Sequence, residues 1–211
     1  MKKIITQDHI ESAMDWAYQR AVDGIPGMGS AGELAADYAS GSGTDYQKAT
    51  RLIGWQVAKT ATTGFLTGLG GIITIPVSLP ANIAIVLYVQ IRMIAAIACL
   101  GGYDLRDDRI KTFVYMCLAG KGASDIAKSV GIKIGQKLTE NMIKQISGSV
   151  IKEINKKVGF RLLTKFGTTG GINLGKMIPL AGGIIGAAFD GTTTKIIGNV
   201  ARKNFIGEKS K

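Results

Sequence analysis

Residues 60–103 read TATTGFLTGLGGIITIPVSLPANIAIVLYVQIRMIAAIACLGGY, and this stretch decides the fold. It lies between Lys59 and Asp104 and contains a single charged side chain, Arg92. Soluble domains seldom exclude charge over such a length. The stretch is therefore either the most deeply buried part of a helical protein or a part that meets lipid.

The stretch divides into two apolar arms around a reversal bounded by prolines. The first arm, 60–75, is rich in glycine, which lowers helix propensity but permits close approach of two backbones. Pro76 and Pro80 each bias the preceding residue away from helix. The second arm, 81–100, is a strong helix candidate. We expect a central apolar helical hairpin interrupted by Gly and Pro, which is either the core of a soluble bundle or a re-entrant membrane hairpin.

The rest of the chain has helical periodicity and no strand-like alternation of useful length, which predicts an all-α multi-helix bundle. Asp8 and Glu11 have capping-box spacing at the start of the first helix, and Asp107 can cap a later one. An apolar row at every fourth position after residue 126 would wind around one straight helix, so we place a break at Ser147-Gly148. Further helices are expected at 9–23, 33–39, from 45 onward, 108–118, 136–146 and 149–163.

Small residues recur four apart near the C-terminus, and charge is absent from Met177 to Phe189. Such a seam lets helices touch backbone to backbone, so we expect a second, C-terminal hairpin that resembles a glycine zipper. The seam also allows for an oligomer. Our candidates for membrane contact or helix packing in the two apolar regions are Gly64, Gly68, Gly71, Pro76, Pro80, Gly171, Gly175, Pro179, Gly183 and Gly186.

The net charge of +11 comes entirely from the second half of the chain. Residues 1–120 hold ten basic and ten acidic side chains, whereas residues 121–211 hold sixteen basic and five acidic ones. An anionic partner is expected, and acidic membrane lipid is favoured over an acidic protein. Nucleic acid is disfavoured because few aromatic residues interleave the basic ones. The candidate contacts with an anionic surface are Lys137, Lys144, Lys152 and Lys156.

No catalytic constellation is recognisable, and we expect no cofactor and no metal ion. His9 is the only histidine, so any triad or His-containing metal site would have to use it. Residues 27–32 match GxGxxG, but without a preceding strand they are interpreted as a glycine loop. Residues 170–176 approach a phosphate loop, yet Met177 stands where Ser or Thr is required. Cys99 and Cys117 are expected to be reduced and buried.

Arg92 is the residue that most needs an explanation, because a guanidinium in an uncharged stretch is costly unless it is paired or reaches a headgroup. An internal salt bridge to Asp104 or Asp107 and a contact with lipid or a ligand are both open. The acidic residues nearby are interpreted as helix caps and partners of neighbouring arginines, with a metal or catalytic role as the alternative. The candidate functional or buried polar cluster is Arg92, Tyr103, Asp104, Arg106 and Asp107.

Several segments, taken in order, resemble a known family. They are TGFLTGLGG at 63–71, IPVSLP at 75–80, QIRMIAAIA at 90–98, GYDLRD at 102–107, IPLAGG at 178–183 and TKIIG at 194–198. This pattern is similar to the EcsC protein family over about residues 45–206. The resemblance implies a bacterial, mainly helical protein without an assigned activity, whose family namesake is encoded beside an ABC-type transporter. A membrane protein of that type is therefore an expected partner.

We interpret residues 1–211 as one helical EcsC-like domain, with 1–44 as an N-terminal helical extension and 45–206 as the family-like core. The early lysines are followed by Asp8 and His9 rather than by the apolar stretch of a secretion signal, so a cytoplasmic location at the inner membrane is expected. The favoured function is a non-enzymatic accessory or regulatory factor. The alternatives are a membrane-perturbing or pore-forming effector, as in toxicity or phage defence, and a hydrolase of unknown substrate.

Overall fold

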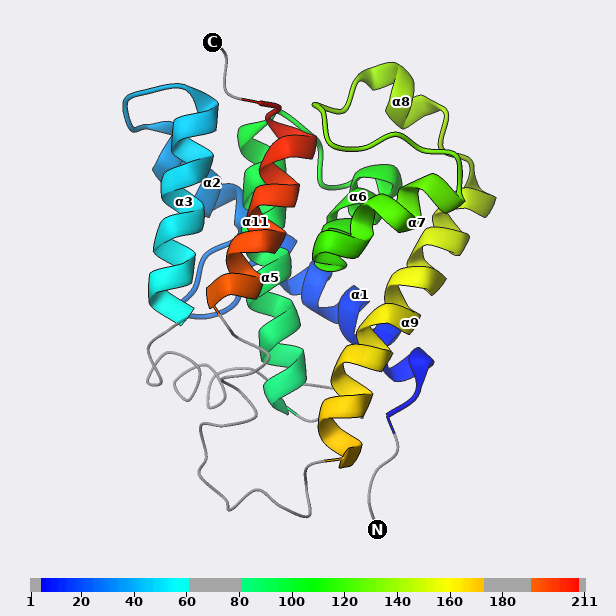
Figure 1. The fold of residues 1–211 in the computed structure, drawn as a ribbon. Coiled ribbons are helices and arrows are strands. Elements are labelled where there is room, and N and C mark those ends of the chain that lie inside the picture. The colour runs from blue at the N-terminus through cyan, green and yellow to red at the C-terminus, as the bar shows by residue number, and fades with distance from the viewer. Residues whose placement is uncertain (1–4, 61–80, 173–190, 209–211) are drawn as a thin grey trace.

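The structure, a computed structural model, describes residues 5–60, 81–172 and 191–208. Within these ranges the protein contains helices and no strand, which confirms the all-α prediction (Figure 1). The helices are α1 (Gln7–Asp23), α2 (Ala31–Ala39), α3 (Asp45–Thr60), α5 (Ala81–Leu100), α6 (Asp108–Leu118), α7 (Ala123–Ser129), α8 (Glu140–Lys144), α9 (Gly148–Ile172) and α11 (Gly191–Phe205), with a 3₁₀ turn, η1, at Gly120–Gly122.

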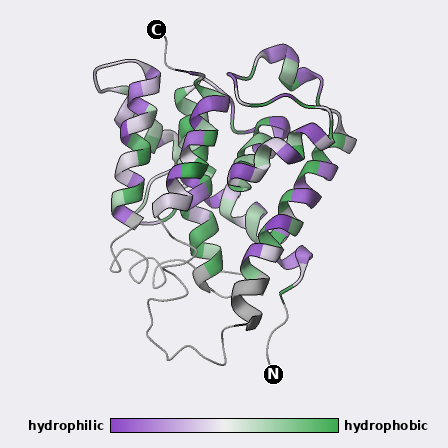
Figure 2. Cartoon of the chain, viewed as in Figure 1, coloured by the Kyte–Doolittle hydropathy of each residue, from purple (hydrophilic) through white to green (hydrophobic). Residues whose placement is uncertain are grey.

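The central helix is α5, whose bounds are those predicted for the second apolar arm. Every residue from Ile83 to Ala98 is buried, and α1, α2, α3, α6 and α11 all pack against it (Figure 1). A helix that is apolar on all sides has to be enclosed on all sides, and α5 is hydrophobic along most of its length (Figure 2). By length and composition it is also the one described helix suited to cross a membrane, yet most of it is buried within the protein. Residues 61–80, which hold the rest of the expected hairpin, lie outside the described residues.

The first helix begins earlier than expected and uses a different cap. The Thr6 hydroxyl accepts from the backbone N–H of His9, and the His9 ring accepts from the N–H of Thr6, so these two residues form the capping box. The expected box of Asp8 and Glu11 is therefore wrong. From this start, Ile10 and the apolar residues that follow at helical spacing bury one face of α1 in the core.

The helix predicted at 136–146 is wrong in most of its length, because only Glu140–Lys144 is helical. Gly131 and Gly135 adopt φ of 75° and 98°, a left-handed conformation that favours glycine and interrupts a right-handed helix. The segment then bonds to α11 instead of to itself: the Leu138 N–H donates to the Asn204 carbonyl at 2.8 Å. The predicted break at Ser147-Gly148 is confirmed, since α9 begins at Gly148.

Four helices have one terminus at the same end of the molecule. The C-terminal ends of α3 and α9 and the N-terminal ends of α5 and α11 are directed toward the bottom of Figure 1, those of α5 and α9 being lowest, and we call this side the lower end. The N-terminal end of α1 lies on the same side. Packing between α3 and α11 agrees with this arrangement, because a Cβ at Gly191 would lie 3.3 Å from a methyl of Val57. The upper end carries α8 and the C-terminal end of α11.

Candidate functional site

Arg92 lies on α5 and is buried, with 9% of its surface exposed. Its Nε donates a hydrogen bond of 2.7 Å to the carbonyl oxygen of Gly29, in the loop between α1 and α2. No carboxylate among the described residues forms an ion pair with it. The internal salt bridge to Asp104 or Asp107 that the sequence left open is thus not formed.

The loop that carries Gly29 is the segment that matched GxGxxG. It follows helix α1 rather than a strand, so the context of a dinucleotide-binding turn is lacking. Ile25 and Met28 exchange backbone hydrogen bonds of 3.0 and 2.9 Å, and the turn between them uses Gly27 at φ 76°. Ser30 then caps α2 in a capping box with Glu33. These bonds fix the path of the loop, and its Gly29 carbonyl accepts from Arg92.

Arg92 lines a pocket of about 440 Å³ between this loop, α2, α3 and α5. We call it the Arg92 pocket. Gln56 of α3 belongs to the same wall and is 4% exposed, so the innermost polar side chains are a guanidinium and an amide. Asp37, Lys59 and Trp55 also line the pocket, and all three are exposed. The pocket therefore has a buried polar floor and a charged, aromatic mouth.

The electrostatics of the pocket favour an anion at its floor. Burial lowers the pKa of Arg92, while Tyr88, Asp37 and Glu33 oppose that shift. Arginine remains charged in proteins despite such shifts, so the floor of the pocket carries a positive charge. Burial, reinforced by the Asp37 carboxylate and opposed by Arg51, raises the pKa of Tyr38, which also lines the pocket.

Sequence reasoning identified Arg92 but missed Gln56 and the mouth of the pocket. Gln56 did have a signal, because it continues the buried stripe of Ala49, Leu52 and Ile53 at helical spacing as a polar residue among apolar ones. Asp37 carries no such signal. It enters the site only because α2 packs against α3 and α5.

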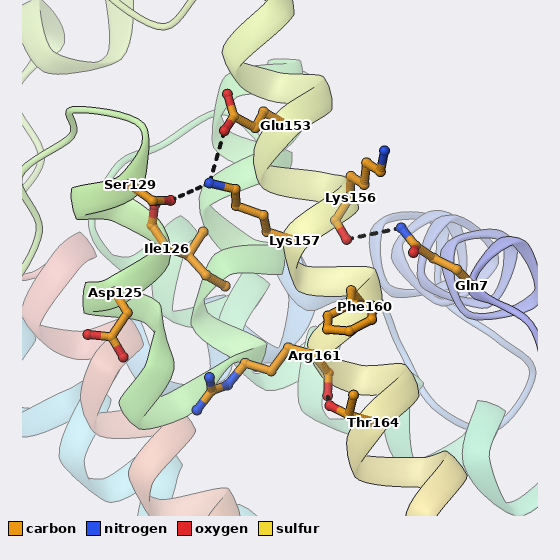
Figure 3. A pocket seen from close by; sticks show the side chains of 10 residues that line it. All are labelled: Gln7, Asp125, Ile126, Ser129, Glu153, Lys156, Lys157, Phe160, Arg161 and Thr164. Atoms are coloured by element: carbon orange, nitrogen blue, oxygen red, sulfur yellow. Dashed lines mark hydrogen bonds and ion pairs between the residues drawn. The ribbon is translucent and has the colours of Figure 1, made fainter.

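A larger groove of about 630 Å³ lies between α7 and α9 and includes Gln7 from α1 (Figure 3). Three of its polar side chains contact one another: Lys157 Nζ lies 2.9 Å from the Glu153 carboxylate and 2.6 Å from the Ser129 hydroxyl. The Gln7 amide donates to the Lys156 carbonyl at 3.1 Å. Only the Phe160 ring stands out, at 59% exposed. The Ser129 hydroxyl contacts an amine that is already paired with the Glu153 carboxylate, so this contact is part of an ion-pair network.

The remaining members of the predicted polar cluster are separate from Arg92 and have structural roles. The Tyr103 hydroxyl donates to the Leu138 carbonyl at 2.6 Å. Asp104 accepts from the Arg106 N–H, and Asp107 caps α6 and pairs with Arg109 at 2.8 Å. The Arg109 guanidinium holds the pKa of Asp107 below its usual value. The hydrolase alternative required Arg92 and these carboxylates around one pocket, and the structure does not bring them together.

The four lysines that were predicted to contact an anionic surface are exposed, but the fold places them in separate regions. Lys144, on α8, and Lys137, whose Cβ lies beside Gly207, are at the upper end. Lys144 pairs with Glu140 at 2.6 Å. Lys152 and Lys156 are exposed on the first half of α9.

Of the glycines and prolines that were predicted to pack between helices or to contact a membrane, one lies in a described helix. Gly171 lies in the last part of α9. The others lie outside the described residues, namely Gly64, Gly68, Gly71, Pro76, Pro80, Gly175, Pro179, Gly183 and Gly186.

Within the described ranges, no group of three or more His, Cys, Asp or Glu side chains is placed to hold a metal ion. His9 is engaged in the cap of α1. Cys117 is buried and Cys99 half-buried, and both are free thiols.

Residues 44–206 match the EcsC protein family, and this region covers most of the chain. The chain belongs to the EcsC family. Among curated proteins and among solved structures, no match to the chain was found. The EcsC region includes α3, α5, α9 and α11, whereas α1, α2 and the loop with Gly29 precede it. The Arg92 pocket therefore has walls from both parts.

Proposed function

We propose that this EcsC-family protein is a non-enzymatic accessory factor that acts at the cytoplasmic face of the bacterial inner membrane and meets the lipid with its lower end. The main support is the position at which two apolar segments of the chain join the helices. Residues 61–80 contain no charged side chain, and residues 173–190 contain only Lys176 and Asp190. Both segments join helices at the lower end, although about a hundred residues of chain separate them (Figure 1).

Charge at the lower end supports an anionic surface. Within α3, α5, α9 and α11, the charged residues in the two turns nearest the lower end are Lys59, Lys165 and Lys195, and Asp190 directly precedes α11. Each well-placed cation contributes about 1 kcal/mol of attraction to anionic lipid. The exposed indole of Trp55, in the last part of α3, is a side chain typical of a membrane–water interface. These cations differ from the four that the sequence favoured, because the fold carries Lys137 and Lys144 to the upper end.

Flotation with vesicles tests the proposal. The protein is mixed with vesicles of phosphatidylglycerol and phosphatidylcholine, or of phosphatidylcholine alone, at low and high salt. We expect recovery only with the anionic vesicles, and less at high salt. A Lys165→Gln, Lys195→Gln variant is expected to bind at least about fivefold more weakly, whereas the matched Lys137→Gln, Lys144→Gln variant keeps its binding. Equal loss in both variants, or no recovery with any vesicle, contradicts the proposal.

The same vesicles separate the accessory function from the membrane-perturbing alternative. An accessory protein that docks on the surface leaves a trapped dye inside, whereas a pore-forming effector releases it. We expect no release at protein concentrations that saturate binding. Rapid release together with growth arrest on overexpression would favour the effector.

A further inference from the structure

We propose that the Arg92 pocket binds a phosphate group, carried either by a small soluble phosphate ester or by a lipid headgroup. The proposal does not depend on membrane binding, since a soluble ester alone would satisfy it. The pocket has three features that together indicate a ligand: unused donors on a positively charged guanidinium, an unpartnered amide and a suitable volume.

The unused donors belong to Arg92. A guanidinium carries five N–H groups, and the bond from Nε to Gly29 uses one of them. The Nη atoms donate to no acceptor among the described residues, although the side chain is nine-tenths buried and lines the pocket. These Nη donors are not among the fully buried atoms that lack a partner, so they are open to the pocket and can donate to an acceptor bound there.

Gln56 is an independent sign of a ligand. Its side chain comes from a different helix, is 4% exposed and faces the same pocket. It makes no hydrogen bond to the described part of the chain, although an amide has two donors and an acceptor. The Gln56 amide and the remaining N–H groups of the Arg92 guanidinium share one cavity and form a donor set for an oxyanion.

The geometry favours phosphate over carboxylate. Arg92 gives the floor of the pocket a positive charge, and the carboxylates of Asp37 and Glu33 act on it from nearby. A phosphate presents three or more oxygens, enough to meet the guanidinium and the amide at once, whereas a carboxylate has two. The volume of about 440 Å³ leaves room for the alcohol part of the ester beside Trp55 at the mouth.

Binding is tested by isothermal titration of the full-length protein with glycerol phosphate and with inorganic phosphate, at constant ionic strength maintained with chloride. The key variant is Gln56→Glu, which keeps the size of the side chain and places a carboxylate on the floor of the pocket. We expect saturable binding by the wild type and at least a tenfold loss in this variant. Arg92→Lys, which keeps the charge but loses the planar fork, is expected to lose affinity as well. Lys48→Gln, on the same helix but outside the pocket, serves as the control and keeps full affinity.

A second arm distinguishes the source of the phosphate. If glycerol phosphate does not bind, the Gln56→Glu variant is compared with the wild type on phosphatidylglycerol vesicles. Loss of vesicle binding in this variant assigns the phosphate to a headgroup. Vesicle binding that survives Gln56→Glu but not Lys165→Gln, Lys195→Gln overturns the pocket proposal and leaves the proposed function intact. Absence of binding in both arms, which means a pocket filled only by water, also overturns it.

Discussion

The Nε of Arg92 and the carbonyl oxygen of Gly29 lie 2.7 Å apart, and this hydrogen bond joins the two parts into which the family match divides the chain. Arg92 belongs to the region that matches the EcsC family, whereas Gly29 belongs to the segment before it. Around this bond, α1 and α2 cover α5. The N-terminal segment is therefore part of the same hydrophobic core as the EcsC region.

Removal of residues 1–43 should abolish cooperative folding. It exposes a face of α5 and leaves the Arg92 guanidinium without its acceptor, and the apolar area lost is large relative to a typical stability of about 5–15 kcal/mol. Thermal unfolding followed by circular dichroism measures the effect. Removal of residues 1–4 alone keeps the Thr6 cap and should leave the transition unchanged. A truncated chain that melts cooperatively at the wild-type temperature would contradict this prediction.

Two glycines, one on α11 and one on α3, should respond in opposite directions to alanine. A Cβ at Gly198 of α11 would lie 2.8 Å from Cγ1 of Ile53, so Gly198→Ala should lower the free energy of unfolding by about 1–3 kcal/mol. A Cβ at Gly54 of α3 meets nothing within 4 Å, so Gly54→Ala should raise it by about 0.5–1 kcal/mol through helix propensity. Urea unfolding checks both, and a stabilised Gly198→Ala variant would mean that α3 and α11 pack less closely.

Asn204 should be required for the path of the chain between α7 and α8. Its Oδ1 accepts from the Gly135 N–H at 2.9 Å, and its Nδ2 donates to the Val200 carbonyl at 3.0 Å. Asn204→Ala leaves the Gly135 donor without an acceptor and should destabilise the protein by about 1–3 kcal/mol. Hydrogen exchange of the Gly135 amide should accelerate more than that of the α5 amides. Asn199→Ala, on the same helix, is the control, and equal exchange rates in the two variants would refute the role of Asn204.

Stability should fall in alkaline solution. Burial raises the pKa of the Cys117 thiol from 9.0 to about 12, with the Asn204 hydrogen bond acting weakly in the opposite direction. The unfolded thiol therefore ionises first, and the contribution of this group to stability is complete below about pH 9 and is lost as the pH rises toward 12. Burial also raises the pKa of Tyr18 and of Tyr115, which adds to the same alkaline loss.

Urea unfolding at a series of pH values between 8 and 11 checks this dependence. Each group contributes a slope of up to about 1.4 kcal/mol per pH unit. Cys117→Ala should show a shallower decline than the wild type above pH 9. Identical slopes in the two proteins would show that the thiol ionises equally in the folded and unfolded states.

The exposed indole should report contact with lipid. Trp16 is buried at 9% exposed and Trp55 is 59% exposed, so a Trp16→Phe variant leaves one solvent-facing fluorophore near the lower end. Anionic vesicles should shift its emission to shorter wavelength and reduce quenching by iodide, because the ring enters a less polar interface. In a Trp55→Phe variant the remaining Trp16 should not respond. An unchanged Trp55 spectrum at saturating lipid would place the contact elsewhere.

Local patterns were enough to predict the helices with strong boundary signals. The bounds of α5 and α6 follow from a long, mostly apolar run and from the Asp107 cap, both of which depend on neighbours in the sequence. The segment 136–146 has an equally good helical pattern but is mostly not helical. Its backbone groups find partners in α11, about seventy residues away, and such long-range bonds leave no mark on local periodicity.

The amino-acid sequence alone established the all-α class, the central apolar helix, the basic second half and the one charge that needed an explanation. Those properties depend on residue type and on spacing along a helix, which can be counted. Only the tertiary structure decided that Arg92 faces Gly29 rather than Asp104, that Gln56 shares its pocket, and that Lys137 and Lys144 lie away from Lys165 and Lys195. These relationships depend on which helix packs beside which, and that packing is set by burial summed over the whole chain rather than by any single segment.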